Sequence, residues 1–352
     1  MVKITEPGIF GELNEKGYHS SQGDQEDADI LRREKMTEQL KKDMADRRAV
    51  KKDMEEEKIY SKEEVTEIVE NQLALKKITI VTGGAGRIGS HLIKALNDQG
   101  EEDILLVDDL SDPSKLHNIN TLKFQDYADK SKFMELLGFL AENKMVECIY
   151  HLGAESSRSC KDGKYLMENN YQYTCNIIDI CSMNDIPLVF ASSATVYGQS
   201  TSFDDTSDDY TPESYYALSK LQTDRYSRKF MENKDNTIIG LRYFNVSPLL
   251  WMIEQYDWKG EISLFKGSKE IKRDFIPIED AVRMTINAMK AGRSGIFNVG
   301  TGKAKSFYHM AADVAERDGS SDESCIKYIP MPEDVAEGYQ KFTQANMDNA
   351  LR

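Results

Sequence analysis

A tyrosine and a lysine stand four residues apart in the segment Tyr216-Ala217-Leu218-Ser219-Lys220. On a helix this spacing puts both side chains on one face, about one turn apart. The lysine charge would stabilise a Tyr216 phenolate, which can then take a proton from a substrate alcohol. Ser193 directly follows an apolar strand-like run and can hydrogen-bond the same alcohol oxygen. These three residues predict a catalytic centre that removes a proton from an alcohol.

A glycine pattern predicts the partner that such an oxidation needs. The β-branched run Ile78–Val81 leads into Gly83, Gly86 and Gly89. The first glycine permits a tight turn, the second lets the backbone approach a pyrophosphate, and the third lets helix pack on strand. The following helix offers free N–H groups to phosphates. Asp108, after the next expected strand, suits a ribose hydroxyl. Together they predict a nicotinamide dinucleotide, which would accept hydride while Tyr216 takes the proton.

The choice between NAD and NADP depends on charges near the ribose. Asp108 and Asp109 would repel a 2′-phosphate, whereas Arg87, Lys115 and Lys130 would attract it if they converge there. Each lysine taken alone is more often a solvated surface charge. We expect NADP, with NAD as the alternative.

The elements that must position these residues alternate in type from Lys77 onward. Apolar strand-like runs separated by helix-like segments predict a doubly wound parallel α/β sheet of Rossmann type. We expect those runs at Ile78–Val81, Ile104–Val107, Cys148–His151, Leu188–Ala191 and Thr237–Leu241. The expected domains are a NAD(P)-binding Rossmann domain at 77–245 and, at 246–352, a smaller C-terminal substrate-binding lobe, with 276–300 returning to the Rossmann domain.

The first 76 residues differ in kind from the rest. Residues 31–70 contain 11 Lys/Arg and 12 Asp/Glu, and Met36, Leu40 and Met44 make only a narrow apolar stripe. So little apolar surface cannot stabilise an independent fold. We expect a charged extension that is helical or disordered. A helix that binds an unknown partner is the alternative, because such a stripe can seat in a groove.

Composition excludes several classes of function. The net charge of −15 argues against nucleic-acid or anionic-membrane partners. The five cysteines form no C-x-x-C pair, no His/Cys/Asp cluster has metal-ligand spacing, and no apolar run suits a signal peptide or a membrane span. We therefore expect a cytoplasmic protein without a metal. His151 lies on an apolar strand and is expected to be a core histidine with satisfied hydrogen bonds.

Several segments resemble one enzyme family more specifically. They include Asn169-Asn170-Tyr171-Gln172-Tyr173, Arg242-Tyr243-Phe244-Asn245-Val246, Lys272-Arg273-Asp274-Phe275 and Tyr339-Gln340-Lys341-Phe342-Thr343-Gln344-Ala345. Over about 77–352 the chain is similar to the ADP-heptose 6-epimerases, which are extended short-chain dehydrogenases/reductases of the NAD-dependent epimerase/dehydratase family. This resemblance implies that the protein interconverts ADP-D-glycero- and ADP-L-glycero-D-manno-heptose at C6, a reaction in the synthesis of lipopolysaccharide precursors. It also leaves a homo-oligomer open.

The resemblance implies a role for individual positions. The cofactor-binding set is Gly83, Gly86, Arg87, Ile88, Gly89, Asp108, Asp109, Lys115, Lys130, Leu152, Gly153, Ala154, Glu155, Ser156, Asn169, Lys220 and Val246. The substrate-binding set is Asn245, Phe265, Lys266, Gly267, Ser268, Arg273 and Tyr339. Arg273 would grip the diphosphate as a two-pronged donor; the alternative is a surface ion pair with Asp274. The catalytic set is Tyr216, Lys220 and Ser193.

A comparison with related dehydratases and one departure from the epimerase pattern bear on activity. Related dehydratases carry Thr-Asp-Glu where this chain has Ser193-Ala194-Thr195, so elimination of water is disfavoured. The family's second acid/base, a lysine reached after Asn245-Val246, has no aligned counterpart, because the chain is about a dozen residues shorter before Phe265. Glu254 and Lys259 remain as candidate substitutes. The alternatives are another nucleotide-sugar epimerase or reductase, and a catalytically impaired protein that binds NADP or a partner.

Overall fold

The computed structural model describes residues 77–156, 160–232, 236–246, 249–317, 323–332 and 339–349. The expected N-terminal extension, residues 1–76, lies outside the described residues. By its internal contacts, the chain from Lys76 onward forms one unit. Within the described ranges, no helix combines the length and the apolar character that a membrane crossing requires.

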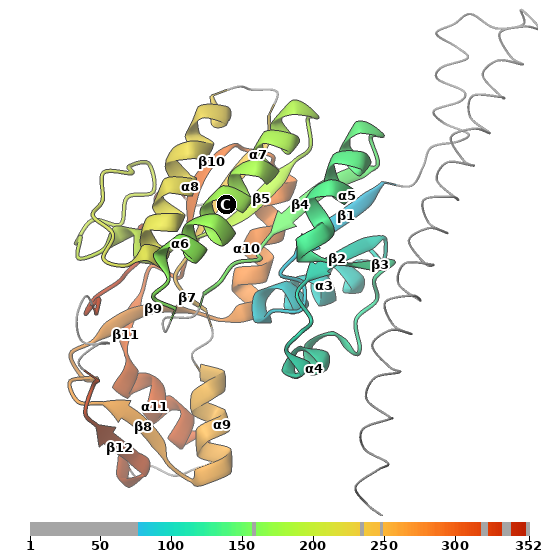
Figure 1. Ribbon diagram of the computed structural model, residues 1–352. Coiled ribbons are helices and arrows are strands. Elements are labelled where there is room, and N and C mark those ends of the chain that lie inside the picture. The colour runs from blue at the N-terminus through green and yellow to red at the C-terminus, as the bar shows by residue number, and fades with distance from the viewer. Residues whose placement is uncertain are drawn as a thin grey trace, which may run out of the picture. The chain divides into compact units, whose positions relative to one another are not determined.

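A seven-stranded parallel sheet lies at the centre of this unit, in the order β10-β6-β5-β4-β1-β2-β3 (Figure 1). Its strands are β1 (Ile78–Thr82), β2 (Ile104–Asp108), β3 (Asp126–Asp129), β4 (Val146–His151), β5 (Leu188–Ser193), β6 (Ile238–Tyr243) and β10 (Gly295–Val299). After β1, the chain adds β2 and β3 to one edge of the growing sheet. It then crosses over to β4, on the other side of β1, and adds β5, β6 and β10 beyond it. Ligands of such sheets bind outside the carboxyl ends, where the order reverses. The expected Rossmann-type fold is confirmed.

Burial explains which strands could be read from the sequence. Every residue of β2 and of β6 is buried. Strands that are covered on both faces consist of nearly continuous apolar residues. By contrast, β3 has a single buried residue, Ala128, between polar neighbours. Its sequence therefore carries no apolar run, and sequence reading missed it.

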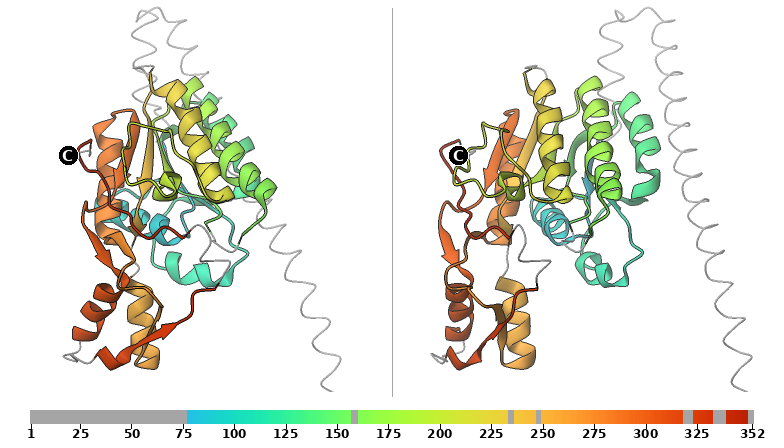
Figure 2. Two further views of the ribbon diagram at one scale, coloured as in Figure 1. Left: turned by 90° about the vertical axis from the view of Figure 1, so that its left-hand side faces the viewer. Right: turned by 60° about the vertical axis from the view of Figure 1, so that its left-hand side comes forward.

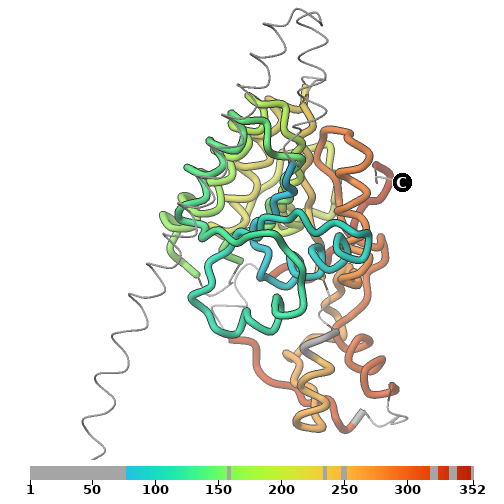
Figure 3. The backbone as a smooth tube through the Cα atoms, turned by 90° about the vertical axis from the view of Figure 1, so that its right-hand side faces the viewer, coloured from blue at the N-terminus to red at the C-terminus, as the bar shows by residue number. Residues whose placement is uncertain are grey.

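Helices cover both faces of the sheet (Figures 1 and 3). They are α3 (Arg87–Asp98) and α10 (Ile278–Ala291) on one face, and α5 (Lys130–Glu142), α7 (Tyr173–Met183) and α8 (Tyr215–Met231) on the other. Leu92 of α3 and Val282 of α10 share a core with Val81 and Leu106 of the sheet. A short π-helical segment, η2 (Met167–Gln172), precedes α7. Single-turn π segments occur frequently at functional sites.

A smaller lobe follows Tyr243 and lies toward the carboxyl ends of the strands (Figure 2). Its elements are β7 (Asn245–Val246), α9 (Leu249–Lys259), β8 (Ile262–Phe265), β9 (Lys272–Ile276), β11 (Ala304–Ser306), α11 (Phe307–Glu316) and β12 (Ile326–Ile329). Strands β11, β9 and β7 form one small sheet, and β12 pairs with β8. Met252, Leu264, Phe275 and Val314 share the lobe's own core. Between β9 and β11 the chain re-enters the large sheet as β10, beside β6.

Candidate active site

The glycine segment makes a tight turn between β1 and α3. Gly83 has a φ of +68°, and a Cβ there would lie 2.6 Å from the Gly153 nitrogen. A Cβ at Gly89 would lie 2.1 Å from the Gly83 oxygen, so both positions require glycine. Helix α3 begins at Arg87, and no side chain caps it at Gly86. Its first N–H groups are thus available to an anion at the switch point of the sheet.

A depression of about 210 Å³ lies beside this turn, at the ends of β1, β2 and β4. It gathers many of the residues that sequence reasoning assigned to the cofactor. Its lining is Thr82, Gly83, Val107, Asp108, Asp109, Lys115, Lys130, Gly153, Ala154, Glu155, Tyr165, Asn169 and Tyr173. The expected cofactor residues outside this lining are Gly86, Arg87, Ile88, Gly89, Leu152, Ser156, Lys220 and Val246. Thr82, Val107, Tyr165 and Tyr173 line the depression but were not expected to bind the cofactor.

Two lysine–aspartate pairs charge the wall of this depression. Lys115 Nζ lies 2.8 Å from Asp108 Oδ1, and Lys130 Nζ lies 3.7 Å from Asp109 Oδ2. The other oxygen of Asp108 accepts a 2.8 Å hydrogen bond from the Ala85 backbone N–H, which ties the glycine turn to β2. The pKa of Asp109 is lowered, first by hydrogen bonds from Ser111 and also by the two lysines. Both ammonium groups thus converge at the end of β2.

Helix α8 carries the proposed base and its lysine. Ser214 caps the helix by accepting a 3.1 Å hydrogen bond from the Ala217 N–H, which puts Tyr216 in the first turn. Lys220 Nζ lies 6.0 Å from the centre of the Tyr216 ring and donates a 2.7 Å hydrogen bond to the Ala191 carbonyl of β5. The Lys220 side chain is buried, at 3% exposure. Burial lowers the pKa of Lys220 from 10.5 to about 8, and Asp224 opposes this shift.

Ser193 stands at the last position of β5, where the strand turns into a short 3-10 helix. Its hydroxyl oxygen accepts hydrogen bonds from the Thr195 N–H at 3.2 Å and from the Thr195 hydroxyl at 3.0 Å. With two donors on the oxygen, the Ser193 proton can still be offered to a substrate oxygen. Lys220 is bonded to Ala191 of the same strand, so Ser193 and the Tyr216 helix are held to one strand end.

His151 is confirmed as a core histidine with satisfied hydrogen bonds. It is 2% exposed, and its ring nitrogens lie 2.6 Å from the Thr82 hydroxyl and 2.9 Å from the Thr174 hydroxyl. Burial lowers the pKa of His151 from 6.5 to about 3, so the ring is neutral.

Arg273 is not the surface ion pair that remained as an alternative. It is 4% exposed, donates a 3.0 Å hydrogen bond to Gln340 Oε1, and lies 5.0 Å from the centre of the Tyr339 ring. Asp274 instead accepts hydrogen bonds from the Thr301 and Gly302 N–H groups, each at 2.8 Å. Gln340 also donates a 2.7 Å bond to the Gly198 carbonyl, so it links Arg273 to the segment after Ser193. Sequence reading quoted Gln340 but gave it no role.

The remaining substrate candidates lie on other parts of the lobe. Asn245 is on β7 and pairs in register with Phe275 of β9. Phe265 ends β8 and leads into the turn of Lys266, Gly267 and Ser268, in which Gly267 has a φ of +88°. Ser268 is 2% exposed, and its hydroxyl has no hydrogen-bond partner among the described residues. A buried hydroxyl without a partner is costly, and a bound ligand can satisfy it.

Both candidate substitutes for the missing lysine are exposed residues of α9. Lys259 ends α9 and its ammonium lies 5.1 Å from the ring of Trp258, which is 82% exposed. Glu254 is exposed on the same helix. Within the described ranges, no cluster of three or more His, Cys, Asp or Glu side chains is arranged to hold a metal.

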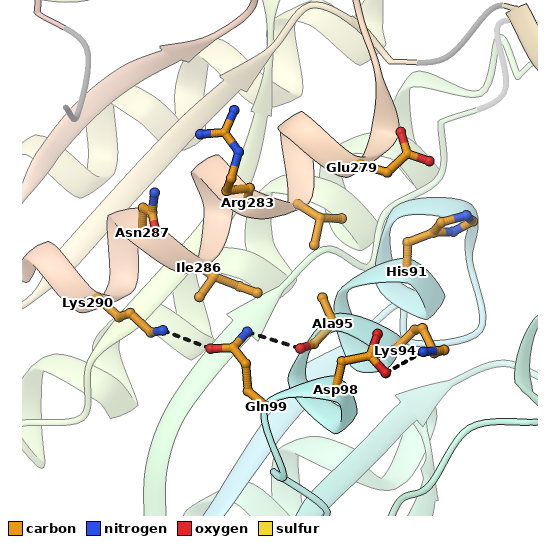
Figure 4. A pocket seen from close by; sticks show the side chains of 11 residues that line it. His91, Lys94, Ala95, Asp98, Gln99, Glu279, Arg283, Ile286, Asn287 and Lys290 are labelled. Atoms are coloured by element: carbon orange, nitrogen blue, oxygen red, sulfur yellow. Dashed lines mark hydrogen bonds and ion pairs between the residues drawn. The ribbon is translucent and has the colours of Figure 1, made fainter.

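A second depression, of about 410 Å³, lies between α3 and α10 (Figure 4). Charged side chains on its rim pair with one another, as Lys94 does with Asp98, and Lys290 donates a 2.8 Å bond to Gln99. It contains none of the residues expected to act in catalysis or binding.

Comparison with known proteins relates this arrangement to a family. The model of the NAD dependent epimerase/dehydratase family matches residues 79–300. The ADP-L-glycero-D-manno-heptose-6-epimerase of Brachyspira hyodysenteriae is 42% identical over 285 residues, which cover 76% of this chain and 89% of that protein.

Solved structures are similar over the same region. A UDP-N-acetylglucosamine 4-epimerase from Methanobrevibacter ruminantium has a TM-score of 0.66 at 26% identity, covering 78% of this chain and 90% of that one. The Helicobacter pylori ADP-L-glycero-D-manno-heptose-6-epimerase has a TM-score of 0.64 at 24% identity, covering 79% and 94% respectively, which shows a shared fold.

The family match extends across the glycine turn, the Ser193 strand end and the Tyr216–Lys220 helix. The family model alone covers more than half of the chain. The chain therefore belongs to the NAD dependent epimerase/dehydratase family.

Proposed function

We propose that this protein is a nucleotide-sugar epimerase that interconverts ADP-D-glycero- and ADP-L-glycero-D-manno-heptose at C6 by transient oxidation with NADP. The observation that carries the proposal is the placement of Lys220. Its ammonium is buried, bonded to Ala191 at the end of β5, and 6.0 Å from the Tyr216 ring. Strand β5 belongs to the same sheet as β1, and the glycine turn follows β1 at the point where the strand order reverses. The 42% identity to a named ADP-heptose 6-epimerase supports the substrate.

The protein's own residues have distinct tasks in this reaction. Tyr216, as phenolate, takes the proton of the C6 hydroxyl. Lys220 stabilises that phenolate, and Ser193 donates a hydrogen bond to the reacting oxygen. A bound nicotinamide would supply the acceptor for the C6 hydride and the donor for its return. Reduction on the opposite face requires the ketone to turn and receive a proton from the same Tyr216.

The residues at the switch point fit a dinucleotide. The backbone contacts of Gly83 and Gly89 leave no room for a Cβ, and the uncapped start of α3 suits a pyrophosphate. We assign the 2′-phosphate of NADP to Lys115 and Lys130, because both ammonium groups line the same depression. NAD is the alternative, since Asp108 and Asp109 already pair with these lysines.

Replacing Lys115 with alanine tests the cofactor assignment. A charged hydrogen bond contributes roughly 1.5–3 kcal/mol, so NADP affinity should fall about 10- to 100-fold while NAD affinity changes little. Lys123→Ala is the matched control, because Lys123 is an exposed lysine that pairs with Glu102 at the other end of β2. Equal losses for the two dinucleotides in Lys115→Ala would contradict the assignment.

The lobe would hold the nucleotide sugar. We assign substrate contacts to Asn245, Arg273, Tyr339 and the segment 265–268, and take 246–352 as mainly substrate-binding, with 276–300 belonging to the Rossmann domain. Arg273 is held in place by Gln340 and by the Tyr339 ring. A planar guanidinium fixed in this way can bind a diphosphate through two parallel hydrogen bonds.

Because a second acid/base residue is missing, we expect complete epimerisation to be impaired more than the separate oxidation and reduction steps. Tyr216 must serve both orientations of the ketone, and general acid help is worth roughly 10²–10⁴-fold. Epimerisation should therefore be slow, whereas dismutation of an aldehyde analogue of the substrate should be better retained. Epimerisation as fast as in a relative that keeps the second lysine would refute this.

The central experiment incubates the purified protein with ADP-heptose of each C6 configuration and follows interconversion by chromatography. Tyr216→Phe should abolish it. Tyr215→Phe is the matched control, because Tyr215 is the neighbouring tyrosine and is 57% exposed. Parallel incubations with UDP-sugars test the alternative of another nucleotide-sugar epimerase. Full activity in Tyr216→Phe would overturn the mechanism.

A further inference from the structure

A chain of buried hydrogen bonds runs behind the cofactor depression. The Gly153 N–H donates to the Thr82 hydroxyl oxygen at 3.2 Å, and that oxygen lies 2.6 Å from His151 Nδ1. On the other side of the ring, His151 Nε2 lies 2.9 Å from the Thr174 hydroxyl, which donates a 2.6 Å bond to the Asn170 carbonyl. Thr82, His151, Thr174 and Asn170 are each no more than 3% exposed.

The two ends of this chain determine the direction of every bond. The Asn170 carbonyl can only accept, so Thr174 spends its one proton there and must accept from His151 Nε2–H. The Gly153 N–H can only donate to the Thr82 oxygen, and among the described residues His151 Nδ1 is the one acceptor within reach of the Thr82 proton, so Thr82 donates to Nδ1. The His151 ring is therefore neutral, with its proton on Nε2. Its low pKa, about 3, agrees with the neutral form.

Each end of this hydrogen-bond chain contacts a different part of the cofactor site. Thr82 immediately precedes Gly83, and Gly153 to Glu155 form part of the wall of the depression. The Asn170 side chain accepts a 2.8 Å bond from the Glu155 N–H and donates a 2.9 Å bond to the Glu155 carbonyl. Its amide also lies 3.5 Å from the Ser219 hydroxyl, which donates a 2.7 Å bond to the Tyr216 carbonyl. The chain thus connects the glycine turn with the first turn of the Tyr216 helix.

We infer that His151 is a positioning residue for the dinucleotide: through its Nε2–H tautomer it holds the Gly153–Glu155 wall in register with the glycine turn on one side and with Asn170 on the other. An apolar side chain of similar volume would fill the core, but the buried Thr82 hydroxyl would lose the acceptor of its proton and the buried Thr174 hydroxyl would lose its donor. The inference rests on the proposed use of a nicotinamide dinucleotide, and it deepens that proposal by adding a residue that does not touch the ligand.

Variants that remove the hydrogen bond at one or the other nitrogen of the His151 ring distinguish an effect on cofactor binding from an effect on folding stability. A glutamine at position 151 can reach Thr174 but not Thr82, and an asparagine can reach Thr82 but not Thr174. Thr82→Val and Thr174→Val cut the same two bonds from the other side. Thr285→Val is the matched control, because Thr285 is a buried threonine of α10 whose hydroxyl also has two partners, Tyr243 and the Ala281 carbonyl.

Dissociation constants for NADPH and NADH, measured with the melting temperature, test the inference. We expect His151→Gln, His151→Asn and both site threonine variants to lose about tenfold or more in dinucleotide affinity, as expected for breaking a buried hydrogen bond. Thr285→Val should lower the melting temperature comparably and leave the affinity unchanged. Unchanged affinity in folded His151 variants would overturn the inference.

A measurement on the cofactor-free protein tests the tautomer directly. In ¹⁵N spectra of histidine-labelled protein, one imidazole should remain neutral with its proton on Nε2 well below pH 6, and its signal should vanish in His151→Gln. A proton on Nδ1, or an imidazolium near neutral pH, would overturn the inference. Wild type that binds NADPH but does not epimerise would refute the proposed reaction alone, whereas wild type that binds neither dinucleotide would refute both.

Discussion

Lys220 is predicted to destabilise the fold at neutral pH. Its pKa in the folded protein is about 8, against 10.5 for an exposed lysine, because burial disfavours the charged form. Between these two values the unfolded chain binds more protons than the folded one, so stability rises with pH there. The cost of burying the charge is therefore fully present below about pH 8 and is relieved as the pH approaches 10.5.

The magnitude follows from the shift. Integrating the proton linkage for these two pKa values gives a change of about 2.5 kcal/mol in the free energy of unfolding between pH 7 and 10. Lys220→Met removes the titrating group, so the stability of wild type relative to this variant should increase by that amount as the pH rises. Denaturant unfolding at both pH values measures it. Titrations of groups that do not interact with Lys220 cancel in the comparison, and so does the lost hydrogen bond to Ala191.

The control is Lys229→Met, which replaces an exposed lysine on the same helix and is measured at the same two pH values. Lys220→Met should also lose activity. At 6.0 Å from the Tyr216 ring, a unit charge in an effective dielectric of about 20 stabilises a phenolate by about 3 kcal/mol, or roughly a hundredfold in rate. A stability difference for Lys220→Met that is the same at both pH values would refute the reasoning.

Three further outcomes follow from the same geometry. His151 has a pKa of about 3 in the folded protein and of about 6.5 when exposed, so the free energy of unfolding of wild type should fall by up to about 1.4 kcal/mol per pH unit as the pH drops below 6.5. An equal fall per pH unit in His151→Gln would contradict this. Gly83→Ala should abolish dinucleotide binding, because its Cβ would meet the Gly153 backbone at 2.6 Å; retained binding in titrations would argue against the cradle. Asp274→Ala should lower the free energy of unfolding by about 3 kcal/mol or more, since the N–H groups of Thr301, Gly302 and Ala345 lose their acceptor; a shift within about 0.5 kcal/mol would disprove it.

Features that depend on neighbouring residues could be predicted from the sequence alone. The apolar runs of β1, β2 and β6 are readable because both faces of a parallel sheet are covered. The spacing of Gly83, Gly86 and Gly89 follows from backbone contacts within one turn, and that of Tyr216 and Lys220 from the period of a single helix. Burial of His151 followed from the apolar strand around it. In each case the physical cause lies within a few residues of the signal.

Only the tertiary structure decided how distant residues share the site. The convergence of Lys115 and Lys130 on Asp108 and Asp109 depends on how β2 and β3 pair, and β3 carries no apolar signal.

Gln340 reaches Arg273 and Gly198 from across the fold, and no local pattern encodes that contact. The tautomer of His151 is determined by two threonines, 69 and 23 residues away in sequence. Hydrogen bonds act over a few ångströms in space, so their partners become known only once the chain has brought those strand ends together.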